Sequence, residues 1–197
     1  MHTPRRGRAT GFTLIELMVV VAIAAILIFV AAPSFQRLIE TQRLRGIADQ
    51  LVTDLQFARA EAVSRNEWVR FRYRNDLSTM TCYTIFTSTA NGQRCNCFLG
   101  AGNACPDART REIKTVQVLN SSRVGFAIPA GQIGTFAFDH LTGSISDIPT
   151  DDDSSPLAQF TLITKIDAGR TLHVTLNSAG RVSICTPSGS EMGGPAC

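Results

Sequence analysis

Residues 11–32 read GFTLIELMVVVAIAAILIFVAA, and the interpretation of the whole chain depends on this stretch. From Phe12 to Ala32 the sequence is an apolar run of 21 residues, interrupted only by Thr13 and Glu16. As an α-helix the run would be about 31 Å long, enough to cross the roughly 30 Å hydrocarbon core of a bilayer. The sequence therefore predicts a membrane-spanning helix over 12–32.

The charges around this run predict its orientation. The chain has 19 basic and 16 acidic residues, and three of the basic ones, Arg5, Arg6 and Arg8, precede the run. Because cationic flanks are retained in the cytoplasm, we expect everything after Ala32 to lie in a periplasm-like compartment. Without the three arginines the chain is close to neutral, so overall basicity gives no argument for nucleic-acid binding.

Glu16 is a carboxylate inside this apolar run. Placing such a charge at the centre of a bilayer costs roughly 2.5–3.5 kcal/mol on insertion scales, and it usually has a partner. No Lys, Arg or His lies within the run. Glu16 therefore predicts a counter-ion from outside the segment, unless the glutamate is protonated or snorkels and has no role.

The helical pattern continues beyond the run. Pro33 would remove one backbone hydrogen bond, so we expect a local break of the helix there. Apolar residues then recur at spacings of three and four, at Phe35, Leu38, Ile39, Ile47, Leu51, Leu55, Ala58 and Ala62. Polar residues on the opposite face are Arg37, Glu40, Arg43, Asp49, Gln50 and Asp54. The pattern predicts a helix to about Arg65 whose apolar stripe packs on a globular head.

From Trp68 the periodicity changes from helical to alternating. Val69, Phe71 and Tyr73 share one face of the first segment, and three arginines share the other. The candidate strands are 68–74, 81–87, 112–119, 123–128, 135–138, 160–166, 171–176 and 181–185, with glycine turns at 91–92, 142–143, 168–169 and 179–180. The expected fold is α+β: a long N-terminal helix packed on a small antiparallel β-sandwich or strongly curved sheet.

All six cysteines follow the apolar run, at Cys82, Cys95, Cys97, Cys105, Cys185 and Cys197. In an oxidising compartment they predict up to three disulfides, with 15 possible connectivities. We expect Cys185 and Cys197 to close the glycine- and proline-rich C-terminal loop, and the other four to tether the segment between the second and third strands. A zinc site built from Cys95, Cys97 and Cys105 is the alternative.

The segment Gly11-Phe12-Thr13-Leu14-Ile15-Glu16-Leu17 closely resembles the type IV prepilin processing site. The resemblance implies that prepilin peptidase cuts after Gly11 and methylates Phe12, and that Glu16 pairs with the new α-amino group of a neighbouring subunit. Pilins also commonly have a proline at the place of Pro33. The implied organisation is a cleaved leader over 1–11, a helix over 12–66 and a β-rich periplasmic head over 67–197. An uncleaved anchor, or a signal peptide cut near Ala31-Ala32, is the alternative.

The head resembles the GspH/FimT branch of minor pilins and pseudopilins. The matching residues are Thr135–Asp139 with Thr142-Gly143, and Leu172–Leu176 with Gly180-Arg181-Val182. The resemblance implies a non-enzymatic subunit of the inner membrane that initiates or caps a type IV pilus or a type II secretion pseudopilus. Its implied partners are prepilin peptidase, other pilins or pseudopilins, the inner-membrane assembly platform and the lipid bilayer.

Other chemistry has little support in the sequence. His140 and His173 stand in no nucleophile, metal or phosphate motif, so we expect no catalytic residue, cofactor or metal. The run Asp151-Asp152-Asp153-Ser154-Ser155 fits a solvated acidic loop better than a calcium loop. Arg181 is a possible DNA contact, because FimT-type pilins implicated in DNA uptake have a Gly-Arg-any-Arg motif. The second arginine of that motif is replaced here by Ser183, and each lost phosphate contact weakens binding.

Overall fold

The computed structural model describes residues 11–76, 79–89, 95–147 and 155–197. The leader arginines, the turn Asn91-Gly92 and most of the acidic run (Asp151 to Ser154) lie outside these ranges. One long helix, α1 (Leu14–Arg65), precedes a set of strands, and the chain divides into the compact units Met1–Ile39 and Glu40–Cys197. The second half of α1 therefore belongs to the same compact unit as the strands, which we call the head.

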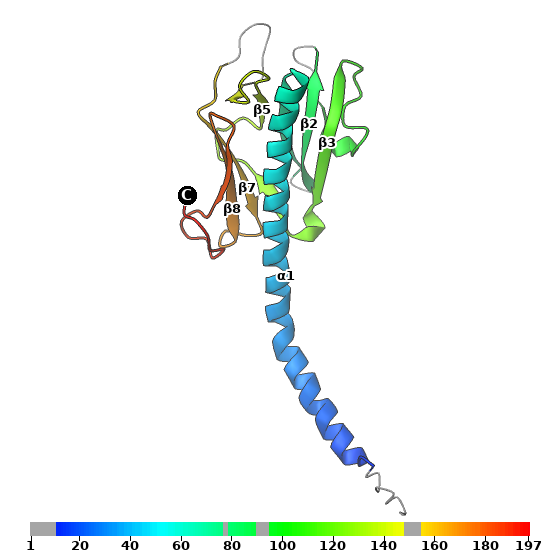
Figure 1. Cartoon of the computed structure of the whole chain (residues 1–197). Coiled ribbons are helices and arrows are strands. Elements are labelled where there is room, and N and C mark those ends of the chain that lie inside the picture. Colours follow the sequence, from blue (N-terminus) through cyan, green and yellow to red (C-terminus); the bar gives the residue numbers. More distant parts are fainter. Residues whose placement is uncertain (1–10, 77–78, 90–94, 148–154) are drawn as a thin grey trace, which may run out of the picture. The chain divides into compact units, whose positions relative to one another are not determined.

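The head contains two antiparallel sheets (Figure 1). The five-stranded sheet has the order β3-β2-β1-β5-β6, built from Thr110–Leu119, Met80–Ser88, Val69–Asp76, Thr135–Phe138 and Ile145–Ser146. The four-stranded sheet has the order β4-β7-β8-β9, built from Gly125–Ala127, Gln159–Lys165, Thr171–Asn177 and Val182–Cys185. Short 3-10 helices occupy Cys97–Leu99 and Asn120–Ser122. The α+β fold expected from the sequence is confirmed.

The eight expected strands all form, with small shifts of their ends. Strand β4 is shorter than the expected 123–128, because Arg123 has a left-handed backbone (φ 59°) that ends the preceding 3-10 helix. Strand β6 was not expected, because two residues are too few for an alternating pattern to show. Its existence depends on pairing with β5, which places Ser146 opposite Ala137.

The core of the head lies between the two sheets and α1. The predicted helical stripe is wrong at Phe35, Leu38 and Ile39, which precede the head and are more than half exposed. It is correct further along α1: Leu51, Leu55, Ala58 and Ala62 are fully buried. They pack in one cluster with the aromatic residues Phe71, Tyr83, Phe126, Phe136, Phe138 and Phe160. The rings of Phe71 and Phe136 stack at 5.0 Å between centroids, and those of Phe136 and Phe160 lie 4.5 Å apart. This shared core, expected to contribute about 1.5–3 kcal/mol per buried aliphatic or Phe side chain, holds the helix to both sheets.

Asp54 departs from the sequence prediction. It was expected on the solvent face of α1 but is only 4% exposed. Its carboxylate accepts a hydrogen bond from the Tyr83 hydroxyl (2.7 Å) and one from the Lys114 ammonium (2.6 Å). A buried carboxylate is tolerated when it is paired and hydrogen-bonded in this way. Asp54 therefore ties α1 to β2 and β3.

Both tyrosines of the chain have buried hydroxyls, which gives a prediction at alkaline pH. Burial raises the pKa of Tyr73 to about 12, and burial together with the bond to Asp54 raises the pKa of Tyr83 further. An unfolded tyrosine titrates near pH 10, so the folded head should lose stability progressively as pH rises above about 10. Ultraviolet titration of the folded chain should give almost no tyrosinate until unfolding begins. A normal tyrosinate titration near pH 10 in the folded chain would contradict the hydroxyl burial.

Candidate functional site

The predicted processing and assembly residues lie at the start of α1. The helix begins at Leu14, and the Thr13 hydroxyl accepts a hydrogen bond from the backbone N–H of Glu16 (3.3 Å). Thr13 thus acts as the N-cap, and Thr-x-x-Glu is the pattern of a capping box. Sequence reasoning missed this cap, although the four-residue pattern was visible. The cap uses the backbone of Glu16 and does not require its carboxylate.

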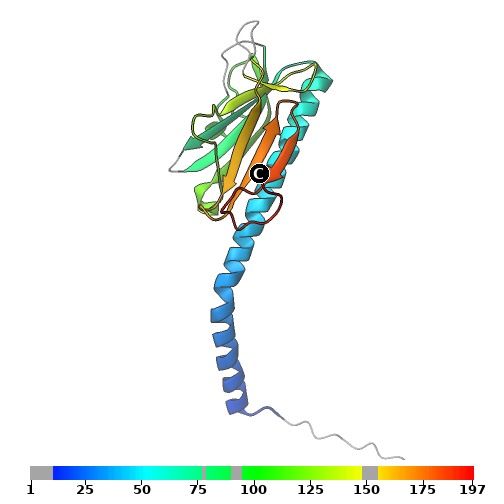
Figure 2. The same ribbon diagram turned by 90° about the vertical axis from the view of Figure 1, so that its left-hand side faces the viewer.

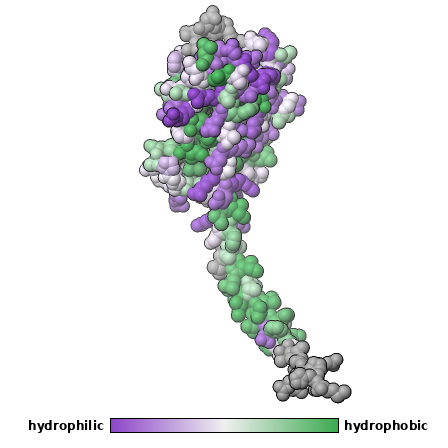
Figure 3. Space-filling view, in the orientation of Figure 1, coloured by the Kyte–Doolittle hydropathy of each residue, from purple (hydrophilic) through white to green (hydrophobic). Residues whose placement is uncertain are grey.

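The side chains of this N-terminal segment are unusually exposed for their chemistry. Phe12 is 81% exposed, and the apolar side chains that follow it are exposed as well; Figure 3 shows them as a green region of the helix. In the part of the chain that the structure describes, no cation forms an ion pair with Glu16. The segment therefore presents a large apolar surface and one carboxylate to surroundings that lie outside this chain.

The helix continues through position 33. Within the described residues no single helix is long and apolar enough to count as a membrane span alone. Two helical segments with a bend between them, Leu14–Phe29 and Ser34–Arg65, together have the length and the apolar composition of a membrane span. The span over 12–32 and the helix break at Pro33 remain predictions.

A second group of residues joins three distant parts of the head. Arg59 on α1 donates its Nε–H to the carbonyl oxygen of Gly143 (3.0 Å), in the turn between β5 and β6. Gly180, in the turn between β8 and β9, lies against the same carbonyl. A Cβ on Gly180 would be 2.2 Å from that oxygen, and both glycines have positive φ angles (67° and 71°). We call these three residues the Arg59 clasp.

Arg181 follows directly after the clasp. Its backbone N–H is bonded to the Asn177 side chain (2.9 Å), while its own side chain is exposed. Together with Gln56, Arg59, Ala60, Val63, Gly180 and Val182 it lines a groove of about 360 Å³. Both turns were predicted as glycine turns, but nothing in the sequence shows that they meet.

The arginine face of β1 is partly covered by another segment of the head. Arg70 is 3% exposed, Arg72 donates to the carbonyl oxygen of Cys95 (3.2 Å), and the Arg74 guanidinium lies 5.1 Å from the ring centroid of Phe98. The segment 95–105 folds over Arg72 and Arg74 on this face. The disulfide Cys82–Cys97 ties the segment to β2, and Cys95–Cys105 closes the segment on itself.

Comparison with known families gives two matches. The model of the type II transport protein GspH matches residues 48–180, well over half of the chain, and that of the prokaryotic N-terminal methylation motif matches residues 6–32. The chain belongs to the GspH family. The match over 48–180 includes the whole Arg59 clasp, and the match over 6–32 includes Gly11, Phe12 and Glu16.

A solved structure supports the same fold for this GspH-family chain. The type IV minor pilin FimU of Pseudomonas aeruginosa, in one crystal form, aligns with a TM-score of 0.51 at 17% identity, covering 75% of this chain and 90% of FimU. A second crystal form of FimU aligns with a TM-score of 0.48 at 16% identity, covering 73% and 93%. A comparison with curated proteins found no match. At this identity the likeness to FimU shows the fold alone.

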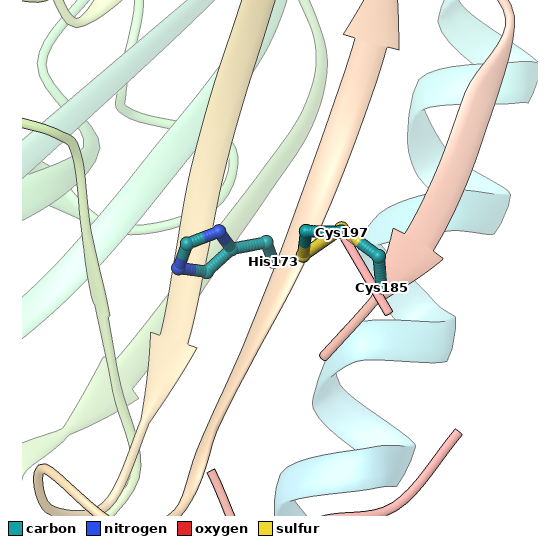
Figure 4. Close-up of side chains that lie close together, drawn as sticks. All are labelled: His173, Cys185 and Cys197. Atoms are coloured by element: carbon teal, nitrogen blue, oxygen red, sulfur yellow. A yellow bond between two sulfur atoms is a disulfide. The ribbon is translucent and has the colours of Figure 1, made fainter. Parts of the chain in front are cut away.

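The cysteines of the GspH-family chain leave no thiol for a metal. Cys185 is bonded to Cys197, the pair expected from the sequence, and no cysteine is free. The alternative zinc site at Cys95, Cys97 and Cys105 is therefore wrong, because all three sulfur atoms are in disulfides. His173 lies beside the third disulfide, with ligand atoms within 4.8 Å of both sulfurs (Figure 4). Zinc binds thiolate sulfur, so this trio is no metal site while the disulfide is intact.

The histidines have structural surroundings. The ring of His140 lies edge-on to that of Trp68, with 5.6 Å between centroids, and the neighbouring Asp139 accepts hydrogen bonds from the backbone of Leu141 and Thr142. His173 lies on β8, and burial lowers its pKa below the usual histidine value.

Proposed function

We propose that the chain is a non-enzymatic, single-pass subunit of the inner membrane that is incorporated into a pilus or pseudopilus. Prepilin peptidase cuts after Gly11 and methylates Phe12. The head lies in the periplasm, where its cysteines oxidise. The processed chain then initiates or caps a filament of a type IV pilus or a type II secretion system. The proposal is supported by the matches to the N-terminal methylation motif over 6–32 and to GspH over 48–180.

The position of Glu16 is the observation on which the proposal mainly depends. It lies in the first turn of an apolar helix, and no described residue of its own chain pairs with it. Cleavage after Gly11 creates a cation, the α-amino group of Phe12, on every processed subunit. In a low-dielectric environment the attraction between a carboxylate and an ammonium is strong enough to select one axial position of a subunit against its neighbour. Filament assembly thus supplies Glu16 with a counter-ion that no described residue of its own chain provides.

The head selects the partners in this proposal. Its disulfides and the shared core make it a rigid unit, and rigid units present a defined surface to neighbouring pilins or pseudopilins. The other partners are the prepilin peptidase, the assembly platform of the inner membrane and the surrounding lipid.

N-terminal sequencing tests the processing step. The chain extracted from host membranes should begin at N-methylated Phe12. Gly11→Val should retain the leader: a Cβ at Gly11 meets no atom within 4 Å, so the substitution leaves the fold unchanged and affects recognition by the peptidase alone. A wild-type N-terminus at any other residue would refute the proposal.

A further inference from the structure

The groove beside the Arg59 clasp is lined by charged and aliphatic side chains to which the proposed function assigns no role. One wall is the outer face of α1 with Gln56, Ala60 and Val63, and the other is the turn that leads into β9 with Arg181 and Val182. Both walls belong to the head. Figure 2 shows β9, the red arrow near the C-terminus, running beside the second half of α1.

The two arginines of the groove differ from five arginines elsewhere in the head. Arg65, Arg109, Arg111, Arg123 and Arg170 each form an ion pair with a carboxylate. Among the residues that the structure describes, neither Arg59 nor Arg181 has such a pair. The groove therefore holds two positive charges that no described carboxylate of this chain neutralises.

Arg59 is also held in place. Its Nε–H donates to the carbonyl oxygen of Gly143, and the side chain packs closely against both Gly143 and Gly180. Arginine presents five N–H donors, so the rest of its guanidinium remains able to bind a planar anion such as a carboxylate. A donor fixed before binding loses little conformational entropy when the ligand arrives.

The rest of the lining is aliphatic. Ala60, Val63 and Val182 line the same space as the arginines, and Val63 is 51% exposed. Phe57, one turn earlier on α1, is 45% exposed. Apolar walls lower the local dielectric and strengthen a charge-assisted hydrogen bond. They also favour a ligand that is itself partly apolar.

We propose that this groove binds an acidic side chain on an apolar segment of a neighbouring pilin-family subunit. The carboxylate pairs with Arg59 and Arg181, and the flanking aliphatic side chains cover Ala60, Val63 and Val182. Nucleic acid fits the groove less well, because backbone binding needs a row of phosphate contacts and the groove offers two cations on an apolar surface. The inference rests on the proposed function, since it supposes that the chain has neighbours in a filament.

Charge reversal in the full-length chain tests the inference. Arg181→Glu should lower the share of the chain recovered with sheared filaments about tenfold or more, the equivalent of about 1.4 kcal/mol, while Arg181→Lys retains most of it. Lys165→Glu is the matched control: it makes the same change of charge on an exposed cation at the end of β7, beside a different groove. It should behave as wild type. Thermal melts of all three variants check the fold.

The partner's chemistry is tested by second-site suppression. A scan that replaces each Asp and Glu of the coexpressed pilin-family subunits with Lys should contain a change that restores Arg181→Glu to the filament. Wild-type recovery of Arg181→Glu, or no suppressor in a complete scan, would overturn the inference. DNA binding would also overturn the inference under one combination of results. The detergent-solubilised wild-type chain would bind duplex DNA at about 0.15 M salt, and Arg181→Glu would abolish that binding while leaving incorporation into filaments unchanged. If the wild-type chain itself is missing from filaments, that result refutes the proposed function rather than the binding role of the groove alone.

Discussion

Glu16→Ala should leave cleavage after Gly11 intact and remove the chain from the filament fraction almost completely. The substitution makes insertion into the bilayer easier, because it removes a charge whose cost reaches roughly 2.5–3.5 kcal/mol at the bilayer centre. Loss of the chain from filaments therefore cannot come from a failure to enter the membrane. The N-terminal cap also survives, since Thr13 bonds to the backbone N–H of Glu16. Under the proposed function, the variant lacks only the partner for the α-amino group of Phe12.

The measurement compares the amount of chain in the membrane and filament fractions, for substitutions at two carboxylates of the same helix. Asp49→Ala removes an exposed carboxylate from α1 in the head and should assemble as wild type. Glu16→Gln separates charge from polarity: it keeps a hydrogen-bonding side chain but should fail nearly as badly as Glu16→Ala. Filaments with a normal content of Glu16→Ala would show that the carboxylate does not set the position of the subunit.

Local patterns in the sequence were sufficient for most of the fold. Helical spacing at Leu51, Leu55, Ala58 and Ala62 and alternation at Val69, Phe71 and Tyr73 report burial directly, because each face of an element meets either core or solvent. The exact ends of the strands did not follow from these patterns, since they depend on turns such as the one at Arg123, which has a left-handed backbone. The seven residues from Gly11 to Leu17 were equally informative about function, because a carboxylate in an apolar helix requires an explanation.

Long-range contacts were the part that the sequence could not supply. Arg72 lies under the segment 95–105 and Asp54 lies opposite Lys114, and both contacts join residues that are distant in sequence. Alternation predicts that Arg72 leaves the core face, but not that another segment covers it. The pairing of Cys82 with Cys97 was likewise one of many connectivities. The same holds for the Arg59 clasp, where two predicted turns meet only because α1 and both sheets share one core.

Gly180→Ala should destabilise the head by about 3–5 kcal/mol. The left-handed backbone alone costs a residue with a Cβ about 1–2 kcal/mol. The new Cβ would also lie 2.2 Å from the carbonyl oxygen of Gly143, a distance that no side-chain rotation can relieve, because both atoms are fixed to backbone. The turn must therefore move, which costs part of the hydrogen bond from Arg59 as well.

Gly131→Ala separates backbone strain from steric conflict. Gly131 has a similar φ of 81°, but a Cβ there meets no atom within 4 Å. That variant should lose only about 1–2 kcal/mol. Thermal unfolding is followed by the fluorescence of Trp68, the single tryptophan. The Tm should fall by roughly 6–20 °C for Gly180→Ala and by about 2–8 °C for Gly131→Ala. Equal shifts would mean that the two turns do not touch, and that Arg59 is free to leave the groove.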